Sequence, residues 1–149
     1  MKEPIVSDST CLIGLERINL LTILPEVFET VTIPSRVEEE FGRSFPWLKV
    51  ENPSDTSLIA SLNSEIHLGE AQTIALAHAK SSLVLLDERR ARSVARRLRL
   101  RMIGTIGTLI IAKQRRIIPK VGPVLDQLEL KNFYIGDELK NEALRIAGE

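Results

Sequence analysis

Short apolar runs alternate with helical patterns along this chain, and that alternation restricts the folds open to it. Residues 4–7, 30–33, 83–86 and 101–103 contain Val, Ile or Leu in short runs, which predicts strands. Helices are predicted over residues 11–19, 34–41, 53–62, 67–79, 88–98, 106–115, 119–128 and 137–147. Alternating strands and helices are typical of parallel sheets covered by helices. The sequence therefore predicts an α/β protein, a three-layer α/β/α sandwich with a mostly parallel central sheet.

Several further properties of the sequence bound its organisation. Residues 48–51 and 133–135 are interpreted as edge strands, and residues 20–24 lead into a turn at Pro25. The 149 residues suffice for one core, and no repeat or long linker divides them, so one domain over residues 1–149 is expected. No apolar run approaches the roughly 20 residues of a membrane span, so no membrane partner is expected. Cys11 is the only cysteine, which predicts a reducing, cytoplasmic location.

Acidic residues stand where predicted strands end. Asp8 directly follows the first apolar run and Asp87 follows the run at 83–86, while Glu40 and Glu70 lie on two further predicted helices. The carboxyl ends of parallel strands meet at one edge of a sheet, so these acids are expected to gather there. Carboxylates in one crevice repel each other, and Mg²⁺ or Mn²⁺, which prefer oxygen ligands, resolve that conflict. The pattern favours a metal-dependent phosphodiester hydrolase.

Each acid also has a simpler interpretation. Asp8 and Asp87 are well suited to cap the helices that follow them, and Glu70 suits the positive end of a helix dipole. The run Glu38–Glu40 has the character of a solvated helix face, and only one of its residues can point at a given site. The metal hypothesis therefore depends on all four acids together, and the sequence leaves open which member of Glu38–Glu40 takes part.

Arginines gather on the predicted helix that begins after Asp87. Arg89, Arg92 and Arg96 lie opposite its apolar stripe, and guanidinium groups match phosphate oxygens well. We predict an RNA- or phosphate-binding strip, with a solvated face or a docking surface for an acidic partner as alternatives. Thr105 follows a predicted strand and opens a helix, so its backbone N–H is a second candidate for phosphate binding. A helix cap is the alternative for Thr105.

Five stretches of the chain together resemble the PIN-domain superfamily, and within it a VapC-like group of small prokaryotic toxin nucleases. These stretches are Ile5–Ile13, Ile33–Phe41, Leu68–Ala77, Leu85–Arg92 and Gly104–Leu109. The resemblance implies a PIN-like fold and an endoribonuclease that depends on Mg²⁺ or Mn²⁺. It implies that Asp8, Glu40 and Asp87 match the metal-binding acids of the family, and that Glu70 stands where many members have Asp. A small antitoxin protein and a second copy of the chain are the partners it implies.

Two other functions are compatible with the same residues. The first is a binding or regulatory module that keeps the fold without the chemistry, and the second is a receiver-like domain phosphorylated on an aspartate. The geometry of the acids separates the first from a nuclease. Carboxylates that converge on one point favour the nuclease, whereas Glu40 or Glu70 facing solvent favours the module.

Overall fold

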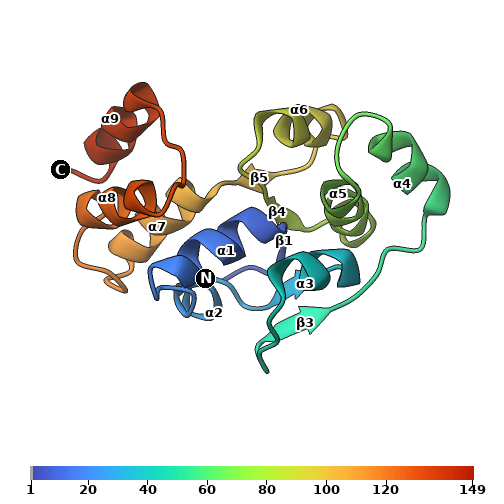
Figure 1. The fold of residues 1–149 in the computed structure, drawn as a ribbon, viewed down its shortest axis with the longest axis horizontal. Helices are drawn as coiled ribbons and strands as arrows, with labels where there is room; N and C mark the ends of the chain where they lie inside the picture. The colour runs from blue at the N-terminus through green and yellow to red at the C-terminus, as the bar shows by residue number, and fades with distance from the viewer. Residues whose placement is uncertain (1) are drawn as a thin grey trace.

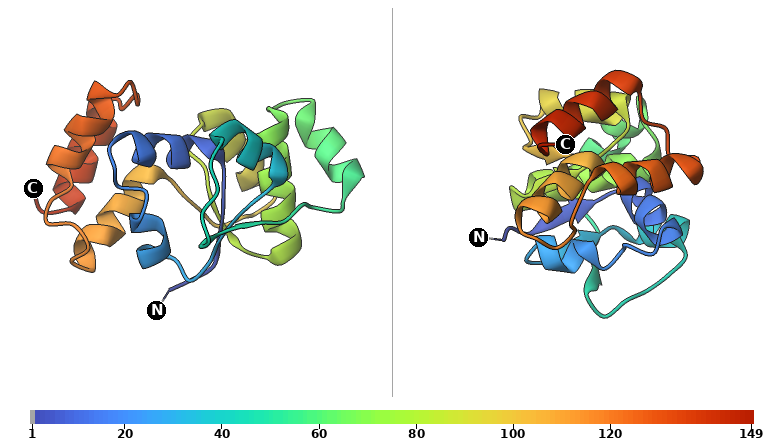
Figure 2. Two further views of the ribbon diagram at one scale, coloured as in Figure 1. Left: turned by 60° about the horizontal axis from the view of Figure 1, so that its bottom comes forward. Right: turned by 90° about the vertical axis from the view of Figure 1, so that its left-hand side faces the viewer.

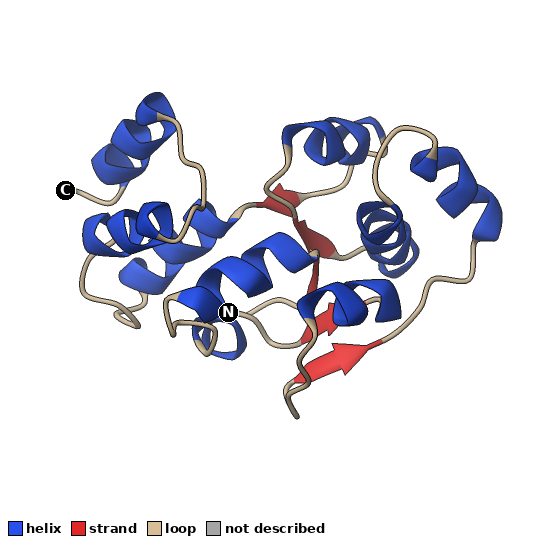
Figure 3. Cartoon of the chain, in the orientation of Figure 1, coloured by secondary structure: helices blue, strands red, loops and turns tan. Residues whose placement is uncertain are grey.

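A parallel sheet with helices on both faces forms the frame of the protein (Figure 1). The computed structural model describes residues 2–149. Its strands are β1 (Ile5–Ser7), β2 (Val31–Ile33), β3 (Leu48–Val50), β4 (Leu83–Leu85) and β5 (Met102–Ile103). They form a five-stranded sheet in the order β3-β2-β1-β4-β5, and every pair of neighbours is parallel. The predicted three-layer α/β/α architecture is therefore confirmed, with the strands running between the helices in Figure 3.

Helices form the two outer layers and extend the molecule at both ends. They are α1 (Ser9–Arg17), α2 (Ile23–Val27), α3 (Ser35–Phe41), α4 (Thr56–Asn63), α5 (Leu68–Lys80), α6 (Arg89–Arg97), α7 (Thr105–Gln114), α8 (Gly122–Leu130) and α9 (Asp137–Ile146). In Figure 1 and in the left view of Figure 2, α8 and α9 lie at one end of the molecule and α4 at the other. The helices in the described part of the chain are too short or too polar to cross a lipid bilayer.

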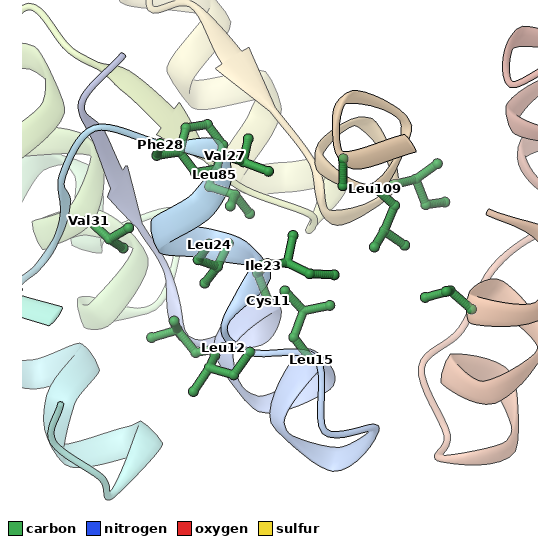
Figure 4. Packing of buried hydrophobic residues seen from close by; sticks show 14 of the residues in the cluster. Cys11, Leu12, Leu15, Ile23, Leu24, Val27, Phe28, Val31, Leu85 and Leu109 are labelled. Carbon is green, nitrogen blue, oxygen red and sulfur yellow. The ribbon is translucent and has the colours of Figure 1, made fainter. Parts of the chain in front are cut away.

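The sheet separates two hydrophobic cores, because successive side chains of a strand point to opposite faces. Ile5 and Leu85 join the core formed with α1, α2, α7 and α8, part of which is drawn in Figure 4. Val6 and Val84 join the core formed with α4, α5 and α6. Strands buried on both faces read as continuous apolar runs, which explains why β1 and β4 are visible in the sequence.

The order of the strands creates a topological switch point between β1 and β4, and the place beyond the carboxyl ends of these two strands is here called the β1–β4 crevice. From β1 the chain builds β2 and β3 on one side, and it then crosses to build β4 and β5 on the other. Ser7 pairs with Leu85, so the two strands end side by side. In open α/β sheets, ligands bind at such a switch point, beyond the carboxyl ends of the strands. A receiver domain has the order 2-1-3-4-5 instead, so the receiver hypothesis is wrong.

Two of the predicted local structures, the strand at residues 133–135 and the turn at Pro25, are wrong. Residues 133–135 form no strand but the loop between α8 and α9, where the N–H of Phe133 donates to the carbonyl of Leu128 as the helix ends. The Phe133 ring lies against Gly14 of α1, so its apolar character serves packing rather than pairing. Pro25 stands inside the short helix α2 rather than in a turn. Proline is accepted there because the first turn of a helix requires no N–H from it.

Candidate active site

Asp8 lies directly beyond β1, at the crevice between β1 and β4. It occupies the N-cap position of α1, yet its side chain makes no capping hydrogen bond. Only 5% of Asp8 is exposed, and no Lys, Arg or His among residues 2–149 forms an ion pair with it. A buried carboxylate without a cation or a capping role is costly, so the simple cap interpretation does not account for Asp8.

The surroundings of Asp8 raise its pKa from 3.8 to about 7. Burial is the main cause, because it disfavours the charged form. The backbone of Ser9 acts in the opposite direction, while the negative charges of Glu70, Glu40 and Asp87 raise the pKa further. Asp8 is thus close enough to the other three predicted acids to interact with them electrostatically.

Asp87 follows β4 on the other side of the crevice. Its carboxylate does not cap α6, because Glu88 takes that place and accepts the N–H of Ala91. Asp87 instead accepts two hydrogen bonds from Thr105 at the start of α7, one from the backbone N–H (2.8 Å) and one from the hydroxyl (2.6 Å). Burial raises the pKa of Asp87, while the Thr105 hydrogen bonds and the charge of Arg92 oppose that rise.

Thr105 serves Asp87 in this structure rather than an open phosphate site. Its side chain is fully buried, and both its backbone N–H and its hydroxyl are donated to Asp87. No donor of Thr105 is left for a phosphate in this arrangement. The Gly104–Thr105 pair at the opening of a helix was the sequence signal, but the signal does not show which acid the helix start would hold.

Replacing Thr105 by valine should destabilise the protein. Valine has nearly the same shape but removes the hydroxyl that donates to Asp87, and hydrogen bonds to charged groups contribute about 1.5–3 kcal/mol. We expect Thr105→Val to lower the free energy of unfolding by that amount in urea denaturation at neutral pH. Thr105→Ser keeps the donor and should lose clearly less. Equal losses in the two variants would show that methyl packing, not the hydrogen bond, matters at this position.

Glu70 lies in the first turn of α5 and is 7% exposed. One of its oxygens, Oε1, accepts the backbone N–H of His67 at 3.2 Å, which closes a capping box at the start of this helix. Burial raises its pKa, and the neighbouring charges of Glu88 and Glu40 add to that effect. The side chain of Glu70 therefore caps α5 and at the same time belongs to the group of acids around Asp8.

Glu40 is the member of Glu38–Glu40 that joins the acidic group. Glu39 points to solvent and forms a weak ion pair with Arg36, and Glu38 accepts a hydrogen bond from the Ser44 hydroxyl. The negative charge of Glu40, by contrast, raises the pKa of both Asp8 and Glu70. It remains exposed on one side, at the end of α3, and its carboxylate lies against the first turn of α5.

The three predicted arginines line one groove together with Asp87. Arg89, Arg92 and Arg96 share this groove with Asp87, and its volume is about 870 Å³. The remaining wall comes from β5, α7 and α9 and is largely apolar. Arg92 is half-buried and donates from Nη1 to the carbonyl of Leu86 (2.7 Å), whereas Arg89 and Arg96 are exposed. The arginine strip therefore begins next to Asp87 and runs away from it along α6.

Comparison with known families decides the kind of domain. A family model described as a PIN domain matches residues 4–149. The chain belongs to the PIN domain family. PIN domains are typically nucleases and generally use divalent metal ions. No curated protein matches the chain significantly.

The acids of this PIN domain fit a hard divalent cation by their chemistry. Asp8, Glu40, Glu70 and Asp87 offer only oxygen donors, and the buried carboxylate of Asp8 has no ion-pair partner among residues 2–149. In the arrangement described for residues 2–149, no group of three or more His, Cys, Asp or Glu side chains is placed to hold a metal ion. The structure thus brings the acids into one neighbourhood without closing them into a ligand set.

Sequence reasoning missed the roles that three residues, His67, Gly104 and Thr105, have in this PIN domain site. His67 holds Glu70 through its backbone, and Gly104 leaves room for Asp87, because a Cβ on Gly104 would stand 3.0 Å from the Asp87 carboxylate. Thr105 was noted for a phosphate, not for Asp87. None of these three groups is charged, so they do not stand out in the sequence as the acids do. Only the three-dimensional contacts reveal their roles.

Proposed function

We propose that this PIN domain is a metal-dependent endoribonuclease of the toxin–antitoxin type that hydrolyses RNA phosphodiester bonds. The observation that carries the proposal is Asp8, a buried carboxylate at the β1–β4 switch point. It has no cationic partner in the described part of the chain, and the negative charges of Glu40, Glu70 and Asp87 raise its pKa. A divalent cation would relieve this repulsion and would restore Asp8 to its ionised form at neutral pH.

Asp8 and Asp87 are the proposed direct ligands of Mg²⁺ or Mn²⁺, with Glu40 and Glu70 as further ligands or as acceptors that position water. Such an ion, when bound, lowers the pKa of water and stabilises the leaving oxygen of a phosphodiester. Thr105 holds the Asp87 carboxylate in one orientation, and His67 holds one oxygen of Glu70. The second oxygen of Glu70 remains for the site.

The proposed RNA path follows the arginines. Arg89 and Arg96 are exposed along the groove that ends at Asp87, so they can neutralise phosphates that flank the bond to be cleaved. Arg92 stands nearest the acids, tied to the carbonyl of Leu86, and its charge offsets part of the repulsion between Asp87 and a phosphate. A small antitoxin protein, a homodimer and a cytoplasmic location stay predictions.

The test of the proposal is RNA cleavage by the purified protein in the presence of Mn²⁺ or Mg²⁺. We expect internal cleavage of single-stranded RNA with Mn²⁺, no cleavage after EDTA treatment, and recovery when the metal is returned. Soaking crystals in Mn²⁺ should give an anomalous peak among Asp8, Glu40, Glu70 and Asp87. Bound Mn²⁺ without cleavage of any RNA would contradict the nuclease proposal.

A binding module that retains the fold is the second candidate. It is favoured by the solvent exposure of Glu40, by the lack of a closed ligand set among residues 2–149 and by the capping role of Glu70. The two candidates differ in their response to metal. A module of this kind should bind no Mn²⁺ at the β1–β4 crevice, and its RNA or protein binding should be unchanged by EDTA.

Neutralising the arginine strip should weaken RNA binding and reduce its salt dependence. Each phosphate contact on single-stranded nucleic acid contributes about 0.7 to the slope of log affinity against log salt. Replacing Arg92 and Arg96 by glutamine should therefore lower that slope by about 1.4, measured by fluorescence anisotropy in an Asp8→Asn background that does not cleave the RNA. Arg97→Gln with Arg101→Gln is the matched control, since it removes the same charge outside the groove. If both pairs behave alike, the strip is only a solvated face.

A further inference from the structure

Gly69 occupies an unusual place beside the acidic group. It is the second residue of α5, it is buried, and a Cβ built on it would overlap Oε1 of Glu40. The same Cβ would stand 3.2 Å from Cδ and 3.4 Å from Oε2 of Glu40. The nearest atoms around this position therefore all belong to one carboxylate. No backbone atom is among them.

The backbone at Gly69 does not itself require glycine. Its φ lies outside the left-handed region, and the residue sits within a regular helix where alanine is the better helix former. The hydroxyl of Thr73 donates to the Gly69 carbonyl (2.8 Å), a contact that any residue could accept. What alanine would lose is the space that the Glu40 carboxylate fills.

Because the Glu40 carboxylate fills this space, it lies at the start of α5, next to Glu70. The carboxylate rests on the positive end of α5, a helix of 13 residues, and this end favours negative charge. Glu70 is the next residue along the same helix turn, and the charge of Glu40 acts on both Glu70 and Asp8. Glu40 is exposed at the end of α3, so a carboxylate lifted off this turn would be free to move away from the other acids.

We propose that Gly69 is a positioning residue of the metal centre, because its missing side chain leaves the space in which the Glu40 carboxylate stands beside Asp8 and Glu70. The effect on metal binding rests on the proposed function. The three atoms nearest to a Cβ at position 69 belong to the flexible end of Glu40, so the fold can accept alanine when that carboxylate moves away. Residues that orient metal ligands typically change metal affinity by about 10–100-fold when they are replaced.

The experiment measures the affinity for Mn²⁺ alone, by titration monitored with electron paramagnetic resonance, in a double-mutant cycle. Gly69→Ala should weaken Mn²⁺ binding at least about tenfold, while its melting temperature in EDTA stays equal to that of the wild type or rises. In a Glu40→Gln background, Gly69→Ala should cause little additional loss, since the displaced group is already neutral. Gly136→Ala is the matched control, because the nearest side-chain atom to its Cβ is the Tyr134 hydroxyl at 3.8 Å.

The outcomes separate this inference from the proposed function. Unchanged Mn²⁺ affinity in Gly69→Ala, or a loss that adds fully to that of Glu40→Gln, overturns the positioning role and leaves the nuclease proposal intact. If the wild type binds no Mn²⁺, the proposed function fails. The role of Gly69 is then decided by a metal-free crystal structure of Gly69→Ala. A Glu40 carboxylate still resting on α5 in that structure overturns the inference, whereas a displaced one supports the positioning of Glu40 by Gly69 and overturns only its link to a metal.

Discussion

Asp8→Asn should abolish nearly all Mn²⁺-dependent RNA cleavage, a loss of at least about a thousandfold by analogy with the removal of essential catalytic groups. The change replaces a charged oxygen donor at the centre of the acidic group by a neutral amide of the same size. Cleavage of a labelled single-stranded RNA, followed over time at saturating Mn²⁺, gives the rate. Asp87→Asn should act in the same direction, since Asp87 is the second acid of the β1–β4 crevice.

The control for this loss is an aspartate outside the site. Asp126 is exposed on α8 and pairs with Lys140, so Asp126→Asn makes the same chemical change without touching the crevice. It should retain the wild-type rate. Equal cleavage by the wild type and by Asp8→Asn would mean that the activity comes from a contaminating nuclease rather than from this protein.

The same substitution should stabilise the metal-free protein at alkaline pH. The pKa of Asp8 rises from 3.8 to about 7 on folding, and this costs the folded state up to roughly 4 kcal/mol above pH 7. The sign follows from proton binding. Between the two pKa values the folded chain holds a proton that the unfolded chain has released, so stability falls as the pH rises from about 4 to 7. An asparagine carries no such cost.

Urea denaturation in EDTA at two pH values measures this effect. At pH 8, Asp8→Asn should be more stable than the wild type by up to roughly 4 kcal/mol, and at pH 4 the difference should be small. Added Mn²⁺ should stabilise the wild type and leave the variant unchanged, because only a ligand that binds the folded state shifts the equilibrium. A variant that is less stable than the wild type at pH 8 would show that Asp8 is well accommodated as an anion without metal.

Strong local patterns made much of the fold predictable. β1 and β4 are buried on both faces and therefore appear as continuous apolar runs, and the aspartates that follow them point to the switch point. The helix predicted over residues 34–41 ends at Gly42, which takes the left-handed conformation that glycine adopts without strain. The strand predicted at residues 133–135 is wrong because aromatic and β-branched residues occur in strands and also in loops that pack on the core. Nothing local distinguishes a loop that covers α1 from an edge strand.

The finer arrangement of the acids depends on contacts that are distant in sequence. The sequence could not choose among Glu38–Glu40, because the choice is made by the first turn of α5, a separate element. It could not show that Asp87 would be held by Thr105 rather than capping its own helix. In both cases a partner from another part of the chain decides the orientation of a carboxylate.

The pairing of β1 with β4 also determines when the acidic crevice can form during synthesis. Ile5 pairs with Leu83, so β1 is completed by a strand that leaves the ribosome much later. Contacts of such large sequence separation form slowly, since a long loop must close before they are gained. A nascent chain that ends before β4 has Asp8 and Glu40 but neither Asp87 nor the arginines of α6. The crevice is therefore assembled only after β4 and the residues that follow it have been translated.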